Sequence, residues 1–525
     1  MCGSLVHYLN AYFKRLRDHY CHRNDTARPR DPNDQVVGLL YIFNLIVGTG
    51  ALALPKAFQT AGYGLSIALL VVSSFVSYTS ATFIIECMGI ANAYLDNDKE
   101  KKRINGHDGF ASMSEPEQKE AFEINKRVEV SEMAHMFLGK FGVLLSYFFL
   151  TVYLFGDLAI YSTTVPKSLM NVICSSTNGT TPTGHELCHE HWPDFLTRYV
   201  VYRLSVFLFM LIVTPMVLVG ITRTKYVQLA TSFSRWTAFI LMIILASAQL
   251  IKDGPEASPP VAEFTGFGSL FGVTVYAFMC HHSIPSLITP MRKKDHVHLM
   301  LFSVYTLVIL FYLTLSLTGS FAFEHVQDVY TFNFFHDKNT SFLYLVTDYF
   351  LMLFPVFTLT SNYPIVAITL INNLKVLVTL FGSNKSRETD TEQERLLSEA
   401  SSSDEMDTPP GEISVSPTVP SSNPNTTRII LPIVTLLLPT LLSLYTDDVL
   451  LLATVTGSYP GVGVQFIIPS ILVIGARSYV TKEMKTTVPS SRSSPFKAWF
   501  WPFVLLGWSA FTILNVTVNL FHSAM

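Results

Sequence analysis

The stretch Asn44–Phe58, NLIVGTGALALPKAF, lies inside the first long apolar segment of the chain and decides how that segment can fold. A glycine costs about 1 kcal/mol in a helix interior, and a proline costs about 3 kcal/mol. In lipid, a backbone group that such a break releases finds no water to bond. The sequence therefore predicts a membrane helix that is interrupted at Gly48-Thr49-Gly50, where the freed backbone groups serve a purpose.

The composition is that of a membrane protein. Of the 525 residues, 49% are hydrophobic and 14% are charged, and the mean hydropathy is +0.36. Apolar runs of about 20 residues recur along the chain and match the thickness of a bilayer. We expect an all-α, polytopic membrane protein. The sequence predicts about eleven transmembrane spans, at 36–57, 64–92, 141–172, 199–221, 227–250, 267–290, 298–323, 340–374, 428–446, 449–475 and 498–521.

The distribution of positive charge predicts the orientation. With the N-terminus in the cytosol, most of the 36 Lys and Arg residues fall on cytosolic segments, while Arg198, Lys252 and Lys338 fall on the opposite side. Cytosolic loops of membrane proteins carry this excess of positive charge. We expect a multi-pass protein with a cytosolic N-terminus and an extracellular or lumenal C-terminus. The plasma membrane and an endolysosomal membrane both remain open.

Two cytosolic loops, at about 96–119 and 383–427, are poor in apolar residues and are predicted to be disordered. The second loop places Glu392 ahead of Leu396 and Leu397, at the spacing of an acidic dileucine sorting signal that a clathrin adaptor would read. A chance match in a charged loop is the alternative.

The largest translocated loop has the features of an extracellular or lumenal segment. Asn178 begins the sequon Asn-Gly-Thr, which predicts a glycoprotein. Cys174 and Cys188 flank that sequon, where oxidising conditions permit a disulfide. Two unpaired thiols are the alternative.

A second break lies in the sixth span. That span reads GVTVYAFMCHHSIPSLITP, and His281, His282, Ser283 and Pro285 interrupt it near its middle. Broken helices at corresponding positions of two halves are typical of transporters built from inverted repeats. Close packing of small residues is the alternative for the glycines of the first break. The predicted organisation is a basic arm (1–35), a first repeat (36–250), a second repeat (267–475) and an eleventh helix (498–521).

The two breaks together suit a zwitterion. The start of a half-helix presents N–H groups that favour an anion, and the end of a half-helix presents carbonyls that favour a cation. We expect a small-molecule substrate, with an amino acid as the leading candidate, to rest on both breaks. The candidate substrate-binding residues are Asn44, Val47, Gly48, Thr49, Gly50, Tyr276, Cys280, His281 and Ser283.

Two charges lie deep in predicted spans, Asp157 in the third and Arg235 in the fifth. A charge in the membrane costs at least about 2.5 kcal/mol and marks a functional site by default. Arginine does not titrate in a useful range, so Asp157, His281 and His282 are the candidates to carry a proton. The alternatives are a buried pair of Arg235 with an acid and a hydrogen-bonded core histidine at His281.

NLIVGTGALALPKAF and YAFMCHHSIPSLITP resemble the first and sixth segments of the amino acid/auxin permease family. The resemblance covers most of the chain outside the N-terminal arm and the two polar loops. It implies the five-plus-five, LeuT-like inverted-repeat fold and secondary active transport, but it implies no particular substrate. In sodium-coupled proteins of this fold the ion lies between first-segment carbonyls and eighth-segment hydroxyls, which match Thr358, Thr360 and Ser361 here. Some proton-coupled relatives place a cationic side chain from the fifth segment there, a position that Arg235 matches.

The chain contains no Walker A, His-Glu-x-x-His, Cys-x-x-Cys or Gly-x-Ser-x-Gly motif. We therefore expect no enzymatic activity, no cofactor, no metal and no nucleic-acid partner; the lipid bilayer and a small solute are the expected partners. The predicted function is transport of amino acids or related zwitterions by alternating access, coupled to H⁺ in preference to Na⁺. A non-transporting sensor or scaffold that keeps the transporter fold is the alternative.

Overall fold

The computed structural model describes residues 42–104, 114–174, 186–189, 192–219, 225–291, 294, 296–335, 342–382 and 424–524. The predicted N-terminal arm, the glycosylation sequon at Asn178 and the sorting signal at Glu392, Leu396 and Leu397 lie outside the described residues.

The described chain is helical, and its only β pairing is an isolated bridge between Leu187 and Thr197. The α-helices are α3 (Gly50–Ala61), α4 (Tyr63–Ile104), α5 (Glu115–Ala121), α6 (Val130–Ile173), α7 (Arg198–Val219), α8 (Lys225–Asp253), α9 (Phe267–Ala277), α10 (Ile284–Ile288), α11 (Val297–Ala322), α12 (Phe342–Gly382), α14 (Pro424–Tyr445), α15 (Val449–Thr456), α16 (Ile468–Tyr479) and α17 (Trp501–Ala524). Short helical turns are η1 (Phe264–Gly266), η2 (His281–Ser283), η3 (Tyr330–Phe334), η4 (Gly457–Gly461), η5 (Gly463–Ile467) and η6 (Val480–Met484).

Helix length and composition support a polytopic membrane protein. Within the described ranges, 9 helices are long and apolar enough to cross a membrane. The predicted ninth span corresponds to a shorter apolar helix, Ile430–Tyr445, and the predicted first span is described only from Ile42 onward. The count of about eleven spans and the inverted repeat therefore stay predictions.

The structure corrects the bounds of both polar loops. Helix α4 continues to Ile104 and helix α5 begins at Glu115, so the prediction of disorder over 96–119 is wrong at both of its ends. Charge alone does not end a helix there, because Asp96 pairs with Lys99 and Lys126. The loop predicted at 383–427 also ends earlier, because helix α14 begins at Pro424.

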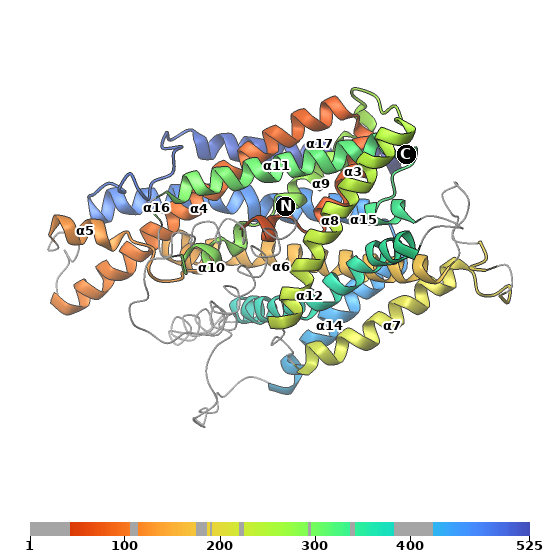
Figure 1. Ribbon diagram of the computed structural model, residues 1–525. Helices are drawn as coiled ribbons and strands as arrows, with labels where there is room; N and C mark the ends of the chain where they lie inside the picture. The colour runs from red at the N-terminus through yellow and green to blue at the C-terminus, as the bar shows by residue number, and fades with distance from the viewer. Residues whose placement is uncertain are drawn as a thin grey trace.

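The helices that carry the two predicted breaks lie together in the bundle (Figure 1). Helix α3 packs against α9 and α11, while α6 packs against α12, α7, α14 and α15. A side chain at Gly50 would place its Cβ 2.7 Å from the Cα of Ala277, so this glycine permits the contact between α3 and α9. Glycine allows such close approach of two helices in a membrane protein.

Candidate functional site

The first break lies where the sequence predicts it. Residues 42–46 are helical, 47–49 leave the helix, and α3 begins at Gly50. Gly48 and Thr49 are partly exposed, whereas Gly50 is buried. A Cβ at Gly48 would meet nothing closer than the carbonyl of Ile46 at 4.0 Å. The packing and binding interpretations therefore apply to different glycines: Gly50 contacts another helix, and Gly48 borders open space.

The second break begins earlier than predicted. Helix α9 ends at Ala277, and His281–Ser283 form a turn ahead of α10. The prediction that the interruption begins at His281 is therefore wrong, because the helix already ends at Ala277. Pro285 lies in the first turn of α10, where a missing N–H is tolerated, so the proline begins a helix here instead of breaking one.

Side chains from two other helices bind the carbonyls at the ends of the half-helices. The Arg235 guanidinium of α8 donates to the carbonyl of Asn44 at 2.9 Å and to that of Val47 at 3.3 Å. The Tyr312 hydroxyl of α11 lies 3.0 Å from the carbonyl of Ile46 and 2.9 Å from that of Ala277. Tyr312 therefore bridges the two breaks. Sequence reasoning missed it, because a single tyrosine in an apolar span carries no distinguishing pattern.

The contacts of Arg235 differ from the predicted packing alternative. Among the described residues, the guanidinium binds backbone carbonyls and forms no ion pair with an acid. Asp157 instead accepts a hydrogen bond from the Tyr276 hydroxyl at 2.8 Å. The cation and the acid thus occupy separate hydrogen-bonded positions.

A chain of three side chains joins the first break to α6 through α9. The Thr49 hydroxyl lies 2.9 Å from the Tyr276 hydroxyl, which donates to Asp157. Tyr276 is 6% exposed and Asp157 is 8% exposed. Thr49 is the N-cap residue of α3, yet its side chain makes no capping bond. The N–H groups of Ala51 and Leu52 already donate to the carbonyls of Gly48 and Thr49, at 3.2 and 3.0 Å. The N–H of Gly50 is therefore the donor that the start of α3 can offer to an anion.

Aromatic and polar groups surround this chain. The Tyr153 ring lies 6.3 Å from the Tyr276 ring and 5.8 Å from the His282 ring, measured between centroids. The Asn44 amide donates to the Ser232 hydroxyl at 3.3 Å, and its Oδ1 has no hydrogen-bond partner among the described residues. Buried polar atoms are normally paired, so an orphaned acceptor indicates where a ligand donor can bind.

Two predicted substrate-binding residues face other helices. The His281 Nε2 lies 3.1 Å from the carbonyl of Ser77 on α4, and the Cys280 sulfur lies 3.5 Å from the Tyr305 hydroxyl on α11. Gln465 donates to the Ser77 hydroxyl at 2.7 Å and completes this buried network. Sequence reasoning missed Gln465, although a lone amide in an apolar segment is a usable signal.

The eighth-segment hydroxyls bond mostly to their own helix. Thr358 donates to the carbonyl of Phe354 at 2.7 Å, and Ser361 donates to that of Thr358 at 2.9 Å. Thr360, on the same helix, is partly exposed. In the described chain, no hydrogen bond joins these three hydroxyls to the first-segment carbonyls that Arg235 binds.

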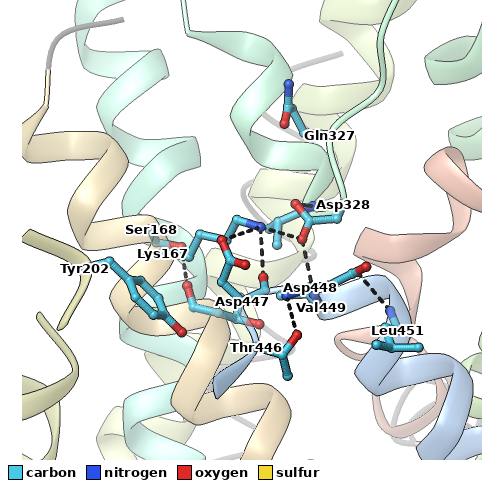
Figure 2. Close-up of polar contacts among 12 residues, drawn as sticks. Lys167, Ser168, Tyr202, Gln327, Asp328, Thr446, Asp447, Asp448, Val449 and Leu451 are labelled. Atoms are coloured by element: carbon cyan, nitrogen blue, oxygen red, sulfur yellow. Dashed lines mark hydrogen bonds and ion pairs between the residues drawn. The ribbon is translucent and has the colours of Figure 1, made fainter. Parts of the chain in front are cut away.

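One end of the bundle is held by a disulfide and an ion-pair cluster. Cys174 and Cys188 form a disulfide that ties the end of α6 to the segment before α7. Nearby on α6, the Lys167 ammonium donates to Asp328 at 2.7 Å and to the carbonyl of Asp447 at 2.9 Å (Figure 2). Asp328 also accepts from the backbone N–H of Val449 at 3.2 Å. This cluster joins α6 to the segment before η3 and to the start of α15.

The comparisons with known proteins agree with this architecture. Residues 36–517 match the family model described as transmembrane amino acid transporter protein. A transmembrane protein 104 homolog from Caenorhabditis elegans is 52% identical over 489 residues, covering 93% of this chain and 96% of that protein. Transmembrane protein 104 from Homo sapiens is 37% identical, covering 93% of this chain and 96% of that protein. A homolog from Dictyostelium discoideum is 33% identical and covers 91% and 95%.

The broken first and sixth segments and the match over nearly the whole chain lead to one conclusion. The protein is a multi-pass membrane protein that belongs to the transmembrane amino acid transporter family, where its similarity is to the transmembrane protein 104 relatives.

Proposed function

We propose that the protein is a secondary active transporter that moves amino acids or related small zwitterions by alternating access, with protons as the coupling ion. The observation that carries this proposal is the partly exposed, uncapped start of α3, which lies beside the buried Tyr276 and Asp157.

The geometry matches the two charges of a zwitterion. The N–H of Gly50 at the start of α3 suits a carboxylate, because the positive end of the helix dipole lies there. The next two N–H groups, of Ala51 and Leu52, already donate to the carbonyls of Gly48 and Thr49. The unpartnered Asn44 Oδ1 suits an ammonium group, because it is an acceptor without a donor. Gly48 lies between these two positions and leaves open space for the substrate backbone.

The position of Arg235 favours protons over sodium. Its guanidinium binds the carbonyls of Asn44 and Val47, which a sodium ion bound at the end of the first half-helix would need. A fixed guanidinium supplies positive charge to those carbonyls permanently, since arginine stays protonated. A transported positive charge then has to be a proton on another group, and Asp157 is the acid closest to the first break through its hydrogen bonds.

Uptake by the purified full-length protein in proteoliposomes tests this proposal. We expect at least one amino acid to accumulate when a proton gradient is imposed, and we expect that uptake to persist when sodium is replaced by a large organic cation. Empty liposomes and liposomes with the Gly48→Leu variant are the controls.

The screen also separates the alternatives. Binding of an amino acid to the detergent-purified protein without uptake would favour a sensor that retains the transporter fold. Uptake that requires a sodium gradient would contradict proton coupling, whereas neither binding nor uptake across the amino acids would overturn the proposed substrate class.

A further inference from the structure

We propose that Thr49, Tyr276 and Asp157 form a hydrogen-bond switch, in which protonation of Asp157 turns the Thr49 hydroxyl hydrogen toward the substrate carboxylate. The proposal rests on the proposed transport function and specifies how one proton is coupled to binding. It follows from the direction in which three oxygen atoms can share their hydrogens.

With Asp157 ionised, the direction of the chain is fixed. A carboxylate only accepts, so the single hydroxyl hydrogen of Tyr276 points to Asp157 over 2.8 Å. The Tyr276 oxygen then has no hydrogen left for Thr49, and the 2.9 Å contact between them requires Thr49 to donate. In this state, the Thr49 hydrogen points to Tyr276, and the Thr49 hydroxyl presents only its oxygen lone pairs to a substrate.

With Asp157 protonated, the same three groups can bond in the opposite direction. The carboxylic acid donates to the Tyr276 oxygen, and the Tyr276 hydroxyl donates to the Thr49 oxygen. The Thr49 hydrogen is then free to donate to an anion at the start of α3. The change takes up one proton from water and otherwise needs only rotation of hydroxyl hydrogens, so no side chain has to move.

The surroundings of Asp157 suit such a switch, because no fixed charge holds the acid in one state. The titratable groups that face its carboxylate are Tyr153 on the same helix and Tyr276 on α9. Tyr161 lies one turn further along α6 and is close enough to Asp157 and to Arg235 of α8 to interact with both charges. The His282 ring contacts the ring of Tyr153.

Among the described residues, no charged side chain from the other helices packed on α6, which are α4, α7, α12, α14, α15 and α16, acts on this carboxylate. A buried carboxylate without a cation depends on its hydrogen bonds, so a proton can join it without breaking an ion pair.

The position of Thr49 links the switch to the substrate. Thr49 is the N-cap of α3, so its hydroxyl lies at the same helix start as the Gly50 N–H, which suits a carboxylate. A lone pair directed at an anion repels it, whereas an O–H directed at it adds a hydrogen bond. Protonation of Asp157 and binding of the anionic group should therefore strengthen each other, as linkage requires.

Infrared difference spectroscopy of the purified full-length protein tests the proton site without any substrate. We expect a carboxylic-acid C=O band that titrates with pH in the wild type and is absent in Asp157→Asn. In Tyr276→Phe the band should shift to the frequency of a less strongly hydrogen-bonded acid. Tyr363→Phe is the matched control, since Tyr363 is a buried tyrosine whose hydroxyl bonds Ser162 on the same helix α6. It should leave the band unchanged.

Substrate affinity measured against pH tests the switch itself. For the wild type, we expect the apparent KM to fall with decreasing pH, by up to about tenfold per pH unit, which is the limit for one linked proton. Tyr276→Phe and Thr49→Val should remove the pH dependence of the apparent KM. Asp157→Asn should bind substrate with an apparent KM that does not depend on pH, because its amide can donate to Tyr276 as the protonated acid does. Tyr363→Phe should keep it.

The outcomes separate the switch from the transport function. A titrating band that survives Asp157→Asn, or a pH dependence that survives Tyr276→Phe, would overturn the switch even if amino acids are transported. Absence of transport would count against the proposed function alone, because the infrared band and its response to Tyr276→Phe still decide whether the chain carries the proton.

Discussion

The middle of the bundle and its two ends use similar polar side chains in opposite ways. At the ends, acids are held by cations: Asp328 by Lys167 (Figure 2), and Glu86 by Arg477. In the middle, Asp157 is held by the hydroxyl of Tyr276 and has no cationic partner in the described chain. A hydroxyl can reverse its donor direction, whereas an ammonium or guanidinium group only donates.

At the end opposite the disulfide, the Glu86 carboxylate is fully paired. Arg477 donates to both carboxylate oxygens of Glu86 at 2.7 and 2.8 Å, and Glu86 also accepts from the backbone N–H of Ser494 at 2.9 Å. Beside it, Arg492 binds the carbonyl of Lys294 at 2.6 Å, and burial together with that guanidinium lowers the pKa of Lys294. Such hydrogen-bonded ion pairs fix the positions of helix ends.

The ends and the middle of the bundle therefore have different roles. Satisfied ion pairs hold the helix ends in register, because breaking one leaves an uncompensated buried charge. The middle keeps orphaned acceptors and reversible hydroxyls, which is what a site that binds and releases a solute needs. Substitutions at the ends and in the middle should therefore have different effects on stability and on uptake.

The largest expected loss of stability is at the end of the bundle that carries the Glu86–Arg477 ion pair. Arg477→Met should destabilise the protein by about 3–5 kcal/mol, because it leaves the Glu86 carboxylate, which is 3% exposed, without its cation. Chemical unfolding in detergent micelles measures this. The double variant Arg477→Met, Glu86→Leu should recover most of the loss; equal instability of the single and double variants would contradict the ion-pair explanation.

At the first break, a larger side chain at Gly48 should remove function and spare the fold. Gly48→Leu fills the open space beside the break, so we expect amino-acid uptake to fall by at least about tenfold, which corresponds to about 1.4 kcal/mol of lost binding. Uptake per amount of reconstituted protein is the measurement. Loss of the folded protein itself would show that Gly48 serves packing.

The neighbouring glycine should behave in the opposite way. Gly50→Ala places a methyl group 2.7 Å from the Cα of Ala277, so we expect a loss of stability of about 1–3 kcal/mol from overpacking. Comparison of its unfolding curve with that of Gly48→Ala, which meets open space, isolates the effect. Equal stability of the two alanine variants would contradict the separate roles of the two glycines.

At the disulfide end, a double-mutant cycle on Lys167 and Asp328 should give a coupling energy of about 1–3 kcal/mol, since the two side chains are 16% and 14% exposed. The exposed pair of Lys99 with Asp96 is the matched control, for which we expect a clearly smaller coupling energy, because solvent screens both charges. Unfolding of the four variants in each cycle provides the energies, and similar values for both pairs would argue against a structural role for the buried one.

The smallest expected effect concerns sodium. Replacing sodium by a large organic cation should change uptake by less than about twofold, because the Asn44 and Val47 carbonyls already bind Arg235 and a fixed guanidinium supplies their positive charge. Initial uptake rates at constant pH measure this. A strong sodium requirement would mean that the ion binds at carbonyls other than these two.

Much of the fold could be predicted because its causes are local. Apolar runs of membrane length, the Gly48-Thr49-Gly50 interruption and the cysteines flanking one loop are all readable from neighbouring residues. The errors arose where local chemistry was overruled by contacts, as at the charged end of α4, which stays helical beside Lys126. The start of the second break was also misplaced, because Pro285 begins α10 instead of interrupting it.

The candidate site could be predicted only in part. The sequence named Thr49 and Tyr276 as parts of one candidate site, and the structure places their hydroxyls 2.9 Å apart. For Arg235 it left two interpretations open, a pair with an acid and a cation near the first segment, and it gave no role to Tyr312. Nothing in the spacing shows that one tyrosine hydroxyl lies against carbonyls of both breaks, at 3.0 and 2.9 Å.

Hydropathy and helix propensity act over one or a few turns, so the amino-acid sequence was enough to predict membrane spans and breaks in the first and sixth segments. The hydrogen-bond partners depend on how the helices pack: Tyr276 reaches an acid 119 residues away, and Arg235 reaches the backbone of the first segment. Hydrogen bonds between side chains need positions correct to a few tenths of an ångström. Those positions are set by the packing of all the helices together, and no single segment encodes them.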